Sequence, residues 1–148
     1  MRFFSTKTFG VDRGLSCSFR QWKATDSSSE YIHGCSLGFK FIFEAHTLDD
    51  KNWVYDIKNA TWIEEYLEHA FGDTLVIAQD DPLLPRFIEL EQNGACDLRV
   101  MPAVGCEKFA ELVHRDISYR VQEETGARVR LKSVEVFEHG STSAVYEE

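Results

Sequence analysis

The segment from residue 33 to residue 45 constrains the fold more than any other part of the chain. Four apolar residues occupy every second position of it, namely Leu37, Phe39, Phe41 and Phe43. Successive side chains of a β-strand point to opposite faces of a sheet, so a period of two predicts a strand with one apolar face. That face has to be buried, which predicts a sheet packed against a second layer.

Other extended segments are expected around this strand. Residues 2–9 are rich in Phe and Thr, which favour strands, and residues 15–22 are predicted to be a second extended segment. Residues 49–52 supply turn chemistry, so residues 53–57 are expected to run back antiparallel as the second arm of a hairpin. Further strands are predicted at residues 98–104, 129–138 and 142–146, the last two being joined by a tight turn at residues 139–141.

Three helices are predicted, the first and the last of them from apolar residues that recur with helical spacing. They cover residues 61–71, 85–92 and 107–124. Thr61 and Glu64 have the spacing of a capping box, which predicts that Thr61 caps the first helix. The order hairpin, helix, helix, hairpin predicts an α+β fold, an antiparallel sheet with two main helices on one face, in a single domain over residues 1–148.

The overall charge argues against one class of partner. The 148 residues include 16 Lys and Arg against 25 Asp and Glu, a formal net charge of −9. Binding to nucleic acid requires a basic face, so we expect no nucleic-acid partner. No apolar run reaches the roughly 18 residues that span a bilayer, and we expect a soluble cytoplasmic protein with no membrane contact. The four cysteines form no CxxC pair and are expected to be free thiols.

His33 and Cys35 are candidate metal ligands. They are two residues apart in the predicted strand, so both side chains leave the same face, and imidazole and thiolate both bind zinc. Zinc needs at least a third protein ligand, which the spacing does not identify. The alternative is that His33 makes an ordinary hydrogen bond and Cys35 fills a small gap.

Two glutamates are candidate ligand-binding residues. Glu138 lies at the end of a predicted strand, where its carboxylate can accept two parallel N–H bonds from the guanidine-like edge of a planar heterocycle. Glu107 follows Cys106 at the start of a helix, where the helix dipole can lower the pKa of a thiol or receive an anion. The alternatives are a solvated Glu138 and a simple helix-capping role at residues 106 and 107.

Over residues 15–146 the chain resembles the 6-pyruvoyl and 6-carboxy tetrahydropterin synthase family. The family's His-Gly-His element corresponds to residues 33–35, and its Gly-Trp-Ile-Ile-Asp-Phe-like segment corresponds to residues 52–57. A Pro-Thr-x-Glu-x-x-Ala element is similar to residues 104–110, the pterin-anchoring Glu falls on Glu138, and Tyr146 closes the match. The resemblance implies the tunnelling fold (T-fold), a pterin-like ligand held by Glu107 and Glu138, and homo-oligomers, trimers stacked into hexamers, with pockets between subunits.

The same resemblance implies that most of the family's chemical residues are replaced. Ser29 stands at the position of the catalytic Cys, and Asp73 stands where the His of an Asp-His proton relay is expected. Of the three zinc-binding His, the first falls near residues 18–20 and the third is Cys35, so that only His33 is retained. A serine without an activating base is a weaker nucleophile than a thiol, and Asp is a poor relay near neutral pH.

Two functions from different classes follow from the resemblance. The replacements favour a binding protein that keeps a pocket for a pterin or related purine-like ligand without the family's lyase activity. The alternative is an active, divergent zinc-dependent lyase acting on 7,8-dihydroneopterin triphosphate, with Ser29 and Asp73 at the catalytic positions and His33 and Cys35 as zinc ligands. A subunit with a purely structural role and no ligand is a third interpretation.

Overall fold

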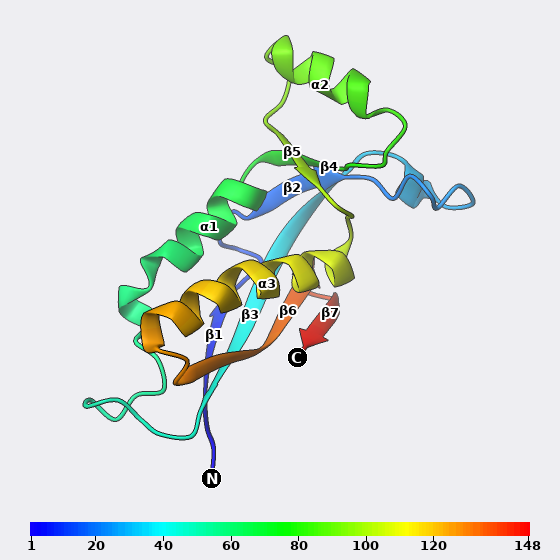
Figure 1. Cartoon of the computed structure of the whole chain (residues 1–148). Coiled ribbons are helices and arrows are strands. Elements are labelled where there is room, and N and C mark those ends of the chain that lie inside the picture. The colour runs from blue at the N-terminus through cyan, green and yellow to red at the C-terminus, as the bar shows by residue number, and fades with distance from the viewer.

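The longest strand, β3 (His33–Ala45), lies at the centre of the computed structural model, which describes all 148 residues (Figure 1). One edge of β3 pairs with β2 (Ser16–Phe19) and then with β1 (Phe3–Phe9), and the other edge pairs with β6 (Val129–Glu138). β7 (Thr142–Glu147) extends the sheet beyond β6. The remaining elements are α1 (Thr61–Phe71), β4 (Thr74–Ala78), α2 (Leu84–Gln92), β5 (Leu98–Met101), α3 (Cys106–Thr125) and the 3-10 helices Ser28–Glu30 and Ile57–Asn59.

Helices α1 and α3 cover one face of the sheet, as the sequence predicts (Figure 1). The rings of Phe39 on β3, Phe71 on α1 and Phe109 on α3 are all fully buried. The Phe71 ring centroid lies 5.1 Å from each of the other two. The apolar face of β3 therefore carries the core that joins the helices to the sheet, and the α+β prediction is confirmed.

The sheet is mixed, whereas the sequence led us to expect an antiparallel one. β4 pairs parallel with β2 and with β5. A strand that re-enters a sheet after a helix can lie parallel to its neighbour, because the helix returns the chain to the starting edge. α1 precedes β4, and α2 lies between β4 and β5. The short apolar run Thr74–Ala78 was not among the predicted strands.

Residues 53–57 do not form the predicted second arm of a hairpin. Both edges of β3 are already paired, so no edge is left for them. The segment is a loop in which Val54 and Tyr55 are buried. The Arg128 guanidinium holds this loop in place by donating hydrogen bonds to the carbonyl oxygens of Thr47 (2.6 Å) and Val54 (2.8 Å).

The start of α1 also differs from the prediction. Ala60 occupies the N-cap position, no side chain caps the helix, and Thr61 is the first helical residue. A 3-10 helix ends immediately before Ala60 and delivers the chain into α1 without the predicted capping box. None of the helices combines the length and the apolar character that a membrane span requires.

Candidate functional site

A small cavity lies where β3 and β6 reach one end of the sheet beside the start of α3. Its volume is about 180 Å³, and we call it the carboxylate pocket. It brings together four of the residues singled out in the sequence, namely Ser29, His33, Glu107 and Glu138. Cys106 and Gly105 at the start of α3 complete one wall.

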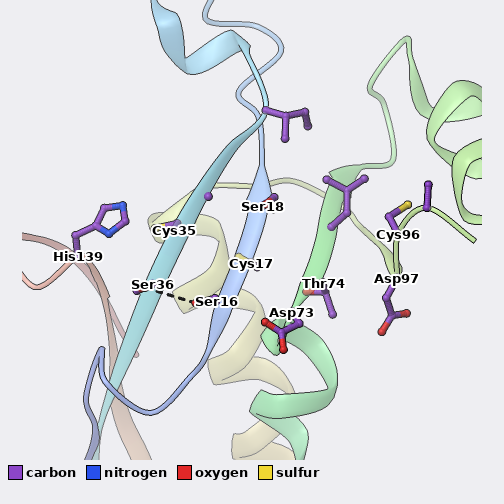
Figure 2. Close-up of a pocket in the computed structure, with 14 residues that line it drawn as sticks. Ser16, Cys17, Ser18, Cys35, Ser36, Asp73, Thr74, Cys96, Asp97 and His139 are labelled. Carbon is purple, nitrogen blue, oxygen red and sulfur yellow. Dashed lines mark hydrogen bonds between the residues drawn. The ribbon is translucent and has the colours of Figure 1, made fainter.

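A second and larger cavity of about 680 Å³ runs across β2, β3 and β4 (Figure 2). Ser16, Ser18 and Ser36 line it from alternate strand positions, so it lies on the sheet face opposite the one that the helices cover. We call it the serine-lined cavity. Asp73 and His139 also border it.

The structure separates the two expected catalytic positions. Ser29 lines the carboxylate pocket, whereas Asp73 lines the serine-lined cavity. The Asp73 amide donates a 2.7 Å hydrogen bond to the carbonyl of Ser16, and the residue has a positive φ of 57° directly after α1. The Ser29 hydroxyl forms no hydrogen bond to a histidine or a carboxylate. Ser29 and Asp73 therefore do not form a nucleophile and relay unit in this structure.

The backbone at the start of α3 fixes the position of Glu107. Gly105 has a φ of 109°, a conformation that favours glycine, and a Cβ there would lie 2.3 Å from Nε2 of Gln21. The same Gln21 amide donates a 3.2 Å hydrogen bond to the carbonyl of Val104. This packing delivers Glu107 to the first turn of α3, on the pocket wall.

Three buried cysteines surround Glu138. Cys17 and Cys35 are direct partners across β2 and β3, and Sγ of Cys106 lies 3.9 Å from Oε2 of Glu138. Burial, followed by the nearby Glu138 charge, raises the pKa of Cys35 and of Cys106 to about 12. Burial, followed by the charges of Cys106 and Glu138, raises the pKa of Cys17 to about 12. All three are thiols at neutral pH, so the helix dipole does not activate Cys106.

His33 and Cys35 have different surroundings, although both lie on the helix-facing side of β3. Nδ1 of His33 is 3.0 Å from the carbonyl oxygen of Tyr31, and its ring packs 4.8 Å from the ring of Phe19. Cys35 instead groups with Glu138 and His139: Sγ, a carboxylate oxygen and an imidazole nitrogen all lie within 4.8 Å of one another. The sequence predicted His139 only as part of a tight turn. Its position directly after Glu138 was the one feature that could have identified it as a member of this group.

Arg20, near which the first family zinc ligand falls, is committed to an ion pair. Its Nε and Nη2 atoms donate to Oδ2 and Oδ1 of Asp81 at 2.8 and 2.6 Å. Burial raises the pKa of Asp81. The hydrogen bonds from Arg20 and from the Leu83 amide, together with the Arg20 charge, lower it by a larger amount, so the pKa lies below its usual value. A three-residue zinc set at positions 20, 33 and 35 therefore does not fit this chain.

A mixed sheet with two helices on one face, and a glutamate-lined pocket at the end of the long paired strands, define the class as a T-fold protein. The family model for 6-pyruvoyl tetrahydropterin synthase matches residues 9–148, and the chain belongs to that family. A search of the curated proteins finds no match.

Solved structures share the fold over essentially the whole chain. An uncharacterized protein from Wolinella succinogenes is 18% identical and superposes with a TM-score of 0.82, covering 100% of this chain and 99% of that one. The 6-pyruvoyl tetrahydropterin synthase of Plasmodium falciparum is 10% identical, with a TM-score of 0.72 and coverage of 99% and 98%. The Caenorhabditis elegans enzyme is 12% identical, with a TM-score of 0.58 and coverage of 100% and 95%. The T-fold prediction is thereby confirmed.

Proposed function

We propose that this chain binds a pterin or a related purine-like ligand in the carboxylate pocket and lacks the lyase activity of its family. One observation carries the proposal. Glu107 and Glu138 share one pocket, while the catalytic positions Ser29 and Asp73 belong to two different cavities. The groups suited to recognition are together, and those suited to catalysis are apart.

The chemistry of the pocket suits a flat ring with adjacent N–H donors. A carboxylate accepts two parallel N–H bonds, which is the arrangement that the amino-pyrimidine edge of a pterin or guanine presents. The Phe19 and His33 rings, which are tilted at 55° to each other, supply an aromatic wall. At about 180 Å³ the cavity is smaller than a typical drug-sized site of about 300 Å³ or more, so we infer that it holds the ring and leaves substituents outside.

Ligand titrations test the recognition step. A reduced pterin and guanine, each titrated by fluorescence quenching, are expected to bind the wild type. Glu138→Gln should weaken binding by at least about ten-fold, because one acceptor of a charge-assisted pair is lost. Glu123→Gln is the matched control, since Glu123 is exposed on α3 and does not line the pocket. Equal affinities for wild type and Glu138→Gln would contradict the proposal.

A turnover assay tests the absence of lyase activity. 7,8-Dihydroneopterin triphosphate incubated with the purified protein and added Zn²⁺ is expected to remain unconverted, because the Ser29 hydroxyl has no base and Asp73 lies in the other cavity. Release of triphosphate, detected by chromatography, would favour the divergent lyase instead. Loss of that release in His33→Ala and Cys35→Ser would then assign it to the family-type site.

A further inference from the structure

We propose that Cys35, Glu138 and His139 form a binding site for a borderline divalent metal ion such as Zn²⁺, displaced from the set that the family resemblance implies. The Sγ atom of Cys35, a carboxylate oxygen of Glu138 and a ring nitrogen of His139 all lie within 4.8 Å of one another. Cys35 comes from β3, Glu138 ends β6, and His139 opens the turn to β7. Figure 2 shows the His139 side chain beside the strand that carries Cys35.

The backbone of these three residues is held by the sheet. Glu138 pairs with Leu37 of β3 on one side and with Thr142 of β7 on the other. The His139 amide donates a 3.0 Å hydrogen bond to the carbonyl of Ser36, the residue that follows Cys35. Donors fixed to adjacent strands need little ordering when an ion binds, which favours a preorganised site.

The donor chemistry selects the class of metal. Binding of the ion displaces the proton of the Cys35 thiol into solvent, and the resulting thiolate, an imidazole and a carboxylate are all zinc ligands. Such a mixed set is unsuited to the oxygen-only preference of Mg²⁺ or Ca²⁺. Metal–ligand bonds of about 2.0–2.3 Å imply donor separations of about 3.5 Å in a tetrahedral site. Donors within 4.8 Å of one another reach that spacing through side-chain movements of about 1 Å.

The site has room for entry and for a fourth ligand. His139 is exposed, while Cys35 is only 3% exposed. Cys35 and His139 border the serine-lined cavity, and Glu138 lines the carboxylate pocket. Three protein ligands with an open position are the pattern of zinc sites that bind water or a substrate group.

The proposed set differs from the family-type set in a way that variants can separate. His33 packs against Phe19 and lies outside the cluster, and Arg20 is held by Asp81. Only Cys35 is common to both sets. The metal takes one carboxylate oxygen of Glu138, so it competes with the two-point contact between Glu138 and a planar ring in the proposed function, and the metal is therefore tested alone.

Titration with Co²⁺ as the probe tests the site on the full chain after treatment with a chelator. A cysteine-bound Co²⁺ ion gives a ligand-to-metal charge-transfer band, and tetrahedral geometry gives intense visible bands. We expect both in the wild type, with displacement by Zn²⁺. His139→Asn should weaken binding by at least about ten-fold, because a direct ligand matters at least as much as the outer-shell groups that orient it. Asn also tolerates the φ of 55° at this position.

Further variants make the outcome decisive. Cys35→Ser should abolish the charge-transfer band, with circular dichroism checking that the protein is folded. Cys96→Ser and His33→Asn are the controls and should retain it, since neither residue belongs to the cluster. No charge-transfer band in the wild type would overturn the proposal. So would an unchanged Co²⁺ affinity in His139→Asn, or a band that is lost in His33→Asn.

Discussion

Arg20 illustrates how one residue can exclude a chemistry and support the fold instead. Its guanidinium makes a two-point contact with an Asp81 carboxylate whose side chain is fully buried. Asp81 also accepts a 2.9 Å hydrogen bond from the Leu83 amide, just before α2 begins. A buried carboxylate with these partners is favourable only while it is charged and paired. Position 20 therefore joins β2 to the loop after β4.

The stability that this ion pair contributes should depend on pH. The pKa of Asp81 is lower in the folded state than its usual value of about 4. A lowered pKa means that the contribution is fully present above about pH 4 and is lost as the pH falls through the folded-state pKa. Asp81→Asn should reduce the free energy of unfolding by about 3 kcal/mol at pH 7, because it leaves Arg20 without its partner.

Urea unfolding at pH 7 and at successively lower pH measures this difference. The gap between wild type and Asp81→Asn should narrow below about pH 4. Asp26→Asn is the control, because Asp26 is exposed and makes no ion pair or side-chain hydrogen bond. A gap that stays constant down to acid pH would show that the charge of Asp81 is not what stabilises the fold.

At the level of elements, local periodicity explains what could be predicted and what could not. β3 and α1 have the predicted bounds, since alternation and helical spacing are properties of the segment itself. β4 is a short apolar run without alternation, which periodicity alone cannot assign. Residues 53–57 have strand-forming composition, but β1, β2 and β6 take both edges of β3. Competition for an edge is not encoded in any one segment.

The candidate site, like the fold, could be predicted from the sequence only in part. Glu107 and Glu138 could be nominated because each begins or ends an element, and both line the carboxylate pocket. The grouping of Cys35 with His139 depends on the register between β3 and β6, which places Leu37 opposite Glu138. Register is set by long-range pairing, so no sequence spacing could bring residues 35 and 139 together.

At the scale of the whole molecule, three strands of the sheet are paired on one side only: β1, which pairs with β3 alone, and the two strands at the ends of the strand order. The strand order begins with β5 and ends with β7, and each of these two end strands has an exposed apolar side chain. Val100 on β5 is 47% exposed and Val145 on β7 is 59% exposed. Free sheet edges with apolar residues tend to pair with another chain. These two edges are consistent with a homo-oligomer, which the family resemblance implies to be a trimer or hexamer.

Pairing through these edges should be sensitive to a charge placed on them. Analytical ultracentrifugation of the wild type is expected to show a trimer or hexamer, and Val145→Lys or Val100→Lys should shift it toward the monomer, because a lysine on an edge strand opposes strand pairing. Tyr119→Lys is the control, since Tyr119 is 73% exposed on α3 and belongs to no strand.

Because Thr142 and Ser143 of β7 also line the carboxylate pocket, dissociation should weaken pterin binding in the same variants. A monomeric wild type, or lysine variants that keep both the assembly and the affinity, would place the ligand within a single chain instead of between subunits.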